Sequence, residues 1–101
     1  MTGYIYLITN TVNDKKYIGQ TRQTVKQRWK EHRNDVKRKK TPLYRAMKKY
    51  GIDKFSIYTL EKIEVNIDIC CFDGFQSRLD QCECAWIKYY DSYHSGYNLT
   101  L

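Results

Sequence analysis

Long apolar segments are absent from this 101-residue sequence, and so is any segment that resembles a secretion signal. No run approaches the roughly 18 apolar residues that a membrane-spanning helix needs. Residues 1–3 lead directly into a predicted strand, without the basic and then apolar stretch of a signal peptide. We therefore expect no membrane association and an intracellular location: the cytoplasm, the nucleus, an organelle or, for a virus-encoded protein, its host.

Cysteine and histidine are too few, and unsuitably spaced, for a typical zinc site. The four cysteines lack the two-residue spacing of a metal knuckle, and only two histidines are present to complete a site. We interpret the cysteines as reduced thiols of an intracellular protein, with a structural zinc as the alternative. They are Cys70, Cys71, Cys82 and Cys84.

The composition is that of a globular protein. Hydrophobic residues make up 42% of the chain and aromatic residues 15%, which argues against intrinsic disorder. A length of 101 residues favours one domain that is large enough for a single core. We therefore interpret residues 1–101 as one domain.

Positive charge is concentrated in residues 22–49. This segment holds twelve basic residues and only two acidic ones, so its net charge is +10. The whole chain has a net charge of +7, so the residues outside this segment sum to −3. Such a segment can be an ordinary solvated helix face. It can also bind nucleic acid, because clustered Lys and Arg displace the counterions condensed on phosphates. The candidate phosphate contacts are Arg22, Lys26, Lys30, Arg33, Lys37 and Arg45.

Two tyrosine-bearing segments near the N-terminus predict a β-hairpin. Residues 4–9 and 15–21 are rich in β-forming residues that alternate along each segment, and Asn and Asp lie in the turn between them. Since strand side chains alternate between faces, Tyr17 and Gly19 share a face. Glycine there permits a bulge or the close approach of another group to the backbone. The hairpin would place Tyr6 and Tyr17 on a common face.

A first helix is predicted after the hairpin. Thr24 is a suitable N-cap, because Gln follows at the third helical position, and the helix should run to about Lys39. Arg28 precedes His32 by four residues, so both side chains can point to the same place. The inward stripe of this helix is Val25, Trp29, His32 and Val36.

Downstream of this helix the sequence predicts five further segments. They are a short helix with Thr41 as its capping residue, Pro42 at its first position and Gly51 at its end, a strand over residues 54–63, a loop over 64–74, a helix over 75–90, and a turn with a short extended piece over 95–101.

Glu83 is a polar exception in the last long helix. At 100° per residue it falls between Leu79 and Ile87, inside the apolar arc. A carboxylate in that position is costly unless it is ion-paired, hydrogen-bonded or bound to a metal ion.

These features together suit phosphodiester hydrolysis, which needs a positioned water and base, a cation for the developing charge, and a hard-ligand metal site. Each feature also has an ordinary explanation. Tyr6 and Tyr17 can be sheet aromatics, Arg28 can belong to a solvated face, His32 can be a hydrogen-bonded packing residue, and Glu83 can pair with a lysine.

At these residues the chain resembles the GIY-YIG nuclease superfamily over nearly its whole length, in the right order. Tyr4-Ile5-Tyr6 is similar to the first motif, with tyrosine where many members have glycine, and Tyr17-Ile18-Gly19 is similar to the second. The other matching positions are Arg28, Glu83 and Gly96-Tyr97-Asn98.

The resemblance implies an α/β (α+β) fold with a small three-stranded antiparallel sheet flanked by helices. It also implies cleavage of DNA with one divalent ion, Mg²⁺ or Mn²⁺. In this interpretation Tyr6 is the general base, Tyr17 places the water and phosphate, Arg28 stabilises the transition state, His32 supports one of these roles, and Glu83 binds the metal. The supporting residues would be Lys16, which would lower the pKa of Tyr17, Gly19 and Asn98.

A homing-type endonuclease is the function we favour, with restriction and repair nucleases as alternatives within the superfamily. Members usually take target specificity from an attached DNA-binding region, so we expect either such a region beyond this domain or a generic phosphate grip from residues 22–49. The rival hypothesis from another class is a non-catalytic basic module that binds nucleic acid by charge and stacking.

Overall fold

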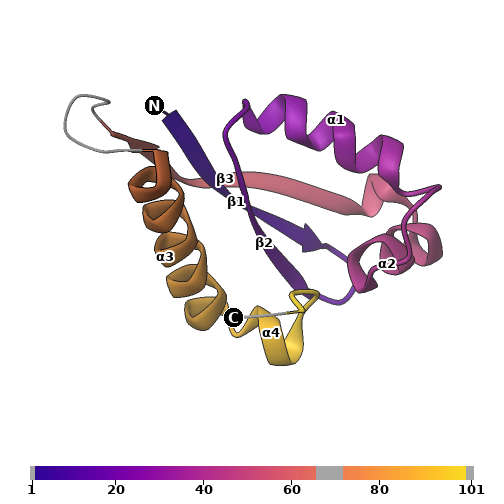
Figure 1. Cartoon of the computed structure of the whole chain (residues 1–101). Coiled ribbons are helices and arrows are strands. Elements are labelled where there is room, and N and C mark those ends of the chain that lie inside the picture. The colour runs from indigo at the N-terminus through magenta and orange to yellow at the C-terminus, as the bar shows by residue number, and fades with distance from the viewer. Residues whose placement is uncertain (1, 66–71, 100–101) are drawn as a thin grey trace.

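The computed structural model describes residues 2–65 and 72–99 and contains a three-stranded antiparallel sheet with helices on both faces (Figure 1). The strands lie in the order β2-β1-β3, so β1 is central. This confirms the predicted fold class. The elements are β1 (Thr2–Asn10), β2 (Lys16–Thr21), α1 (Val25–Asp35), α2 (Pro42–Tyr50), the 3-10 helix η1 (Ile52–Lys54), β3 (Phe55–Glu64), α3 (Phe72–Tyr90) and α4 (Ser92–Ser95).

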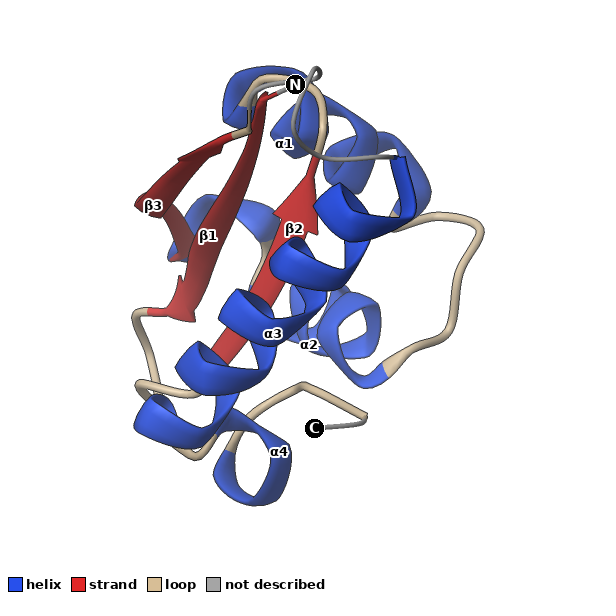
Figure 2. Cartoon of the chain, turned by 60° about the vertical axis from the view of Figure 1, so that its left-hand side comes forward, coloured by secondary structure: helices blue, strands red, loops and turns tan. Residues whose placement is uncertain are grey.

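The alternating side chains of β1 build a core on each face of the sheet. Tyr6 and Ile8 pack with residues of α2, whereas Ile5 and Leu7 pack with residues of α3. Figure 2 shows α3 lying along one face of the sheet. Because both faces of β1 are covered, four consecutive residues, Ile5 to Ile8, are buried, unlike those of a strand with one solvated face.

Helix α1 begins as the sequence predicts and ends earlier. The hydroxyl oxygen of Thr24 accepts a hydrogen bond from the backbone N–H of Gln27 at 3.1 Å, which confirms the N-cap. The predicted end near Lys39 is wrong, because the helix stops at Asp35. Backbone N–H groups of Arg38 and Lys39 both donate to the Asp35 carbonyl oxygen, and the basic residues 37–40 supply no apolar side chain to continue the inward stripe.

Other boundaries follow the sequence with two corrections. Helix α2 starts at Pro42 and ends before Gly51, whose φ of 90° favours glycine, but the Thr41 side chain makes no capping hydrogen bond. Helix α3 starts three residues before the predicted Phe75, so the end of the predicted 64–74 loop is helical. The dipeptide Asp73-Gly74 suggested a turn, but both residues belong to the first turn of α3.

The cysteines are described only in part. Cys82 and Cys84 are half-buried free thiols on α3, whereas Cys70 and Cys71 lie outside the described residues. Within residues 2–65 and 72–99, no helix is long and apolar enough to cross a bilayer.

The C-terminal segment is attached to β2 through the side chain of Asn98. The sequence predicted a short extended piece here but not this attachment. Helix α4, also not predicted, follows Asp91, whose φ is 53°. The Asn98 amide then donates to the carbonyl oxygen of Ile18 and accepts from its N–H, both at 2.8 Å. The Ser92 hydroxyl donates to the same Asn98 oxygen at 2.6 Å. Asn98 therefore satisfies the β2 backbone as another strand would.

We expect Asn98→Ala to lower the free energy of unfolding by about 2–4 kcal/mol, because it leaves the buried N–H and C=O of Ile18 and the Ser92 hydroxyl without this partner. Urea denaturation at neutral pH measures the change. Asn34→Ala, at an exposed position of α1, is the matched control and should change stability by less than about 0.5 kcal/mol. Equal stability of the two variants would contradict this role of Asn98.

Candidate active site

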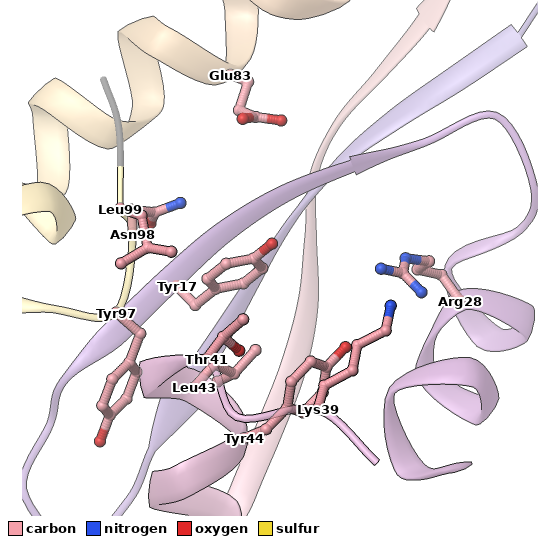
Figure 3. Close-up of a pocket in the computed structure, with 10 residues that line it drawn as sticks. All are labelled: Tyr17, Arg28, Lys39, Thr41, Leu43, Tyr44, Glu83, Tyr97, Asn98 and Leu99. Atoms are coloured by element: carbon pink, nitrogen blue, oxygen red, sulfur yellow. The ribbon is translucent and has the colours of Figure 1, made fainter. Parts of the chain in front are cut away.

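A pocket of about 290 Å³ lies beside β2, where six parts of the chain meet (Figure 3). We call it the β2-edge pocket. Its polar lining comes from β2, α1, the loop before α2, α2, α3 and the C-terminal segment. Among these residues are Tyr17, Arg28, Lys39, Tyr44, Glu83 and Asn98. The structure thus places four of the residues predicted from sequence around one cavity: Tyr17, Arg28, Glu83 and Asn98.

Tyr6 is not among the residues that line this pocket. It is 1% exposed, and its hydroxyl lies 2.8 Å from Nε2 of His32. Its ring crosses the backbone at Gly19, where a Cβ atom would come within 2.3 Å of the phenol oxygen. Gly19 therefore permits a close approach, and the approaching group is the Tyr6 ring.

His32 connects two phenols in the interior. Its Nδ1 lies 2.7 Å from the hydroxyl of Tyr44, while Nε2 faces Tyr6. Burial and the nearby charge of Arg28 lower the pKa of His32 to about 4. The imidazole is therefore neutral at physiological pH, with one nitrogen as donor and the other as acceptor.

The guanidinium of Arg28 interacts with both of these phenols. It forms an ion pair with Glu31 at 3.0 Å, and its side chain remains 25% exposed. Burial raises the pKa of Tyr6 well above its ordinary value, and burial followed by the charge of Glu83 raises the pKa of Tyr17 to about 12. Arg28 opposes both increases, because positive charge favours the phenolate.

Glu83 projects toward the pocket from α3 (Figure 3) and is half-buried. Burial raises its pKa, and a hydrogen bond from the Gln20 side chain acts in the opposite direction. Among the described residues no Lys, Arg or His forms an ion pair with it. A half-buried carboxylate without a cationic partner is chemically suited to bind a hard cation.

The other predicted residues lie outside the pocket lining. Lys16 donates to the carboxylate of Asp14 at 2.9 Å, and its ammonium lies 5.9 Å from the Tyr90 ring centroid, so the predicted influence on Tyr17 has no geometric support. The candidate phosphate contacts all have exposed side chains. They are Arg22, Lys26, Lys30, Arg33, Lys37 and Arg45.

Two pocket residues were not predicted from the sequence. Tyr44 belongs to the buried face of α2, and its sequence position does not distinguish it from a packing residue. Lys39 is one of several lysines in a basic run, and its ammonium lies 3.3 Å from Asp35. Both enter the site because of the early end of α1 and the turn that follows.

We expect the pKa of His32, measured by NMR titration of its ring protons, to lie near 4. The unfolded chain takes up this proton near pH 6.5, so His32 should remove stability as pH falls from about 6.5 to 4, by up to about 3 kcal/mol. A midpoint near 6.5 in the folded protein would contradict the buried, neutral imidazole.

Comparison with known proteins gives consistent results. Residues 2–98 match the model of the GIY-YIG catalytic domain. The chain is 45% identical over 65 residues, or 63% of its length, to Uncharacterized protein 019R of Invertebrate iridescent virus 6, of which it covers 23%. It is 32% identical to Intron-associated endonuclease 1 of Enterobacteria phage T4 over an alignment of 102 positions, which spans 98% of this chain and 37% of that protein. The chain thus spans less than two fifths of either relative.

Solved structures agree with the sequence comparison. The catalytic domain of the homing endonuclease I-TevI superposes with a TM-score of 0.75 at 29% identity, covering 98% of this chain and 99% of that one. A mutant of that domain gives a TM-score of 0.77 at 30% identity, covering 99% and 95%. The motifs, the sheet order and these matches agree: the chain belongs to the GIY-YIG nuclease family.

Proposed function

We propose that this chain is the catalytic domain of a divalent-metal-dependent endonuclease that hydrolyses DNA phosphodiester bonds, with a homing-type role favoured. The observation that carries the proposal is the convergence of Tyr17, Arg28 and Glu83 in one pocket of a GIY-YIG domain. A phenol, a guanidinium and a carboxylate are the groups needed to orient water, neutralise phosphate charge and hold a metal.

Glu83 is the residue that would hold the metal ion. No group of three or more His, Cys, Asp or Glu that could bind a metal occurs in the described part of the chain, so water and a substrate phosphate would complete the shell of a single Mg²⁺ or Mn²⁺. When bound, the ion would supply positive charge beside the phosphate. It would also neutralise Glu83, whose charge raises the pKa of Tyr17.

We assign the water-facing role to Tyr17 rather than Tyr6. Tyr17 lines the pocket, whereas Tyr6 is buried against Gly19 with its hydroxyl on His32. The water oxygen bonds to phosphorus and the ester P–O bond breaks. One water proton passes to Tyr17 in its phenolate form, which the charge of Arg28 favours, and solvent protonates the leaving oxygen. Arg28 stabilises the added charge on the phosphate oxygens, and Tyr6 and His32 hold the surrounding groups in position.

DNA is the proposed partner. Exposed basic side chains of α1 and α2 would contact phosphates without reading sequence, which suits a catalytic domain that acts near a site selected elsewhere. The relatives are longer than this chain, and a DNA-binding region outside the domain remains our prediction, as does an intracellular or viral setting. A non-catalytic basic module is the alternative that the nicking test below separates from this proposal, and restriction and repair roles are alternatives within the family.

We expect Glu83→Gln to reduce nicking of supercoiled plasmid in Mg²⁺ by at least about 100-fold, because the change removes the ligand charge at nearly constant shape. Glu64→Gln is the control: Glu64 is exposed on β3, paired with Lys62. DNA binding should change little in either variant. Equal nicking by the wild type and both variants, or binding without nicking by all three, would refute the enzymatic proposal.

Tyr17→Phe should affect mainly the nicking rate, whereas Tyr6→Phe should affect the free energy of unfolding. In the described residues no hydrogen bond involves the Tyr17 hydroxyl, so Tyr17→Phe should leave stability nearly unchanged and slow nicking about 100-fold. Tyr6→Phe removes a buried hydrogen bond to His32 and should lower the unfolding free energy by about 1–3 kcal/mol. Denaturation and single-turnover nicking measure both. Full activity of Tyr17→Phe would return the base role to Tyr6 or His32.

A further inference from the structure

Tyr44 occupies the pocket end of a hydrogen-bonded chain that runs from Tyr6 through His32. The contacts are 2.8 Å from the Tyr6 hydroxyl to Nε2 and 2.7 Å from Nδ1 to the Tyr44 hydroxyl. Tyr44 is only 4% exposed, yet it lines the β2-edge pocket. In Figure 3 its hydroxyl is directed toward the space that Tyr17 and Arg28 also face.

The direction of this chain follows from counting protons at Tyr6. Its hydroxyl is buried and has two hydrogen-bond partners among the described residues, His32 and Arg28. A guanidinium donates and cannot accept, so the Tyr6 proton must go to Nε2 of His32. If Nε2 carried the imidazole proton instead, the Tyr6 O–H would be a buried donor without an acceptor, at a cost of about 1–3 kcal/mol.

The same count of donors and acceptors determines the direction in which the Tyr44 O–H donates. Neutral His32 with an accepting Nε2 carries its proton on Nδ1, and this N–H donates to the Tyr44 oxygen. Arg28 also interacts with that oxygen as a donor. Within residues 2–65 and 72–99 no acceptor for the Tyr44 proton is bonded to it, and the side of the hydroxyl that remains open is the pocket.

We propose that Tyr44 is a further catalytic residue, whose O–H donates a hydrogen bond to a non-bridging oxygen of the scissile phosphate. This inference rests on the proposed function. Two donors, His32 Nδ1–H and Arg28, polarise the phenol and make it a stronger donor. Lys39, which also lines the pocket, adds positive charge near the same anion. Tyr44 transfers no proton; it stabilises charge that develops on the phosphate.

The first test measures His32 by ¹⁵N NMR at pH 7, without substrate or metal. We expect the Nδ1–H tautomer in the wild type and in Tyr50→Phe, a control on the same helix whose hydroxyl has no hydrogen bond among the described residues. Tyr44→Phe should lose the shift that marks the Nδ1–H···O hydrogen bond. An Nε2–H tautomer in the wild type would overturn the proposal, because Tyr44 would then donate to His32 and not to the pocket.

The second test measures plasmid nicking and DNA binding by Tyr44→Phe and Tyr50→Phe. We expect Tyr44→Phe to lower kcat by on the order of 100-fold with DNA affinity within about twofold of the wild type, and Tyr50→Phe to change neither. Wild-type kcat in Tyr44→Phe would overturn the proposal and leave the nuclease function intact. If the wild type does not nick at all, the proposed function fails, and the tautomer measurement still tests the direction of the Tyr44 hydroxyl.

Discussion

The hydrogen-bonded imidazole of His32 is the interaction on which the site depends. It joins the central strand through Tyr6, helix α1 through its own backbone, and helix α2 through Tyr44. Because the ring is buried and neutral, each nitrogen needs one partner, and loss of either phenol leaves a polar atom to be desolvated for about 1–3 kcal/mol. This requirement fixes how three elements approach one another.

Charge is divided across the β2-edge pocket. Arg28 and Lys39 bring positive charge from the α1 side, Glu83 brings negative charge from α3, and Tyr17 lies between them in the close-up (Figure 3). The Asn98 amide holds the C-terminal segment against β2 and so completes the wall on the side of α3. A phosphodiester with a cation matches this division, because its anionic oxygens can meet the cationic side while the metal meets the carboxylate.

Sequence periodicity was sufficient to predict the three strands and the main helices, because the alternation of β1 and the inward stripe of α1 reflect which side chains are buried. The arrangement of the strands in one antiparallel sheet came from the family resemblance. The motif resemblance identified Tyr17, Arg28 and Glu83 as candidate site residues, and the structure places them around one pocket. Tyr44 could not be found this way, because a core tyrosine and a pocket tyrosine have the same helical position. Helix α1 ends early where backbone N–H groups bond to the carbonyl oxygen of Asp35, and the Lys16 ammonium binds the carboxylate of Asp14. Neither interaction leaves a periodic pattern in the sequence.

The most direct test of the nuclease site is a crystal structure of this chain with a short DNA duplex and Ca²⁺ in place of Mg²⁺ to slow turnover. We expect a cation about 2.3–2.6 Å from the Glu83 carboxylate and a backbone phosphate between it and Arg28, within hydrogen-bonding distance of Tyr17 and Tyr44. DNA bound only along the exposed basic residues of α1, with no cation at Glu83, would contradict the site.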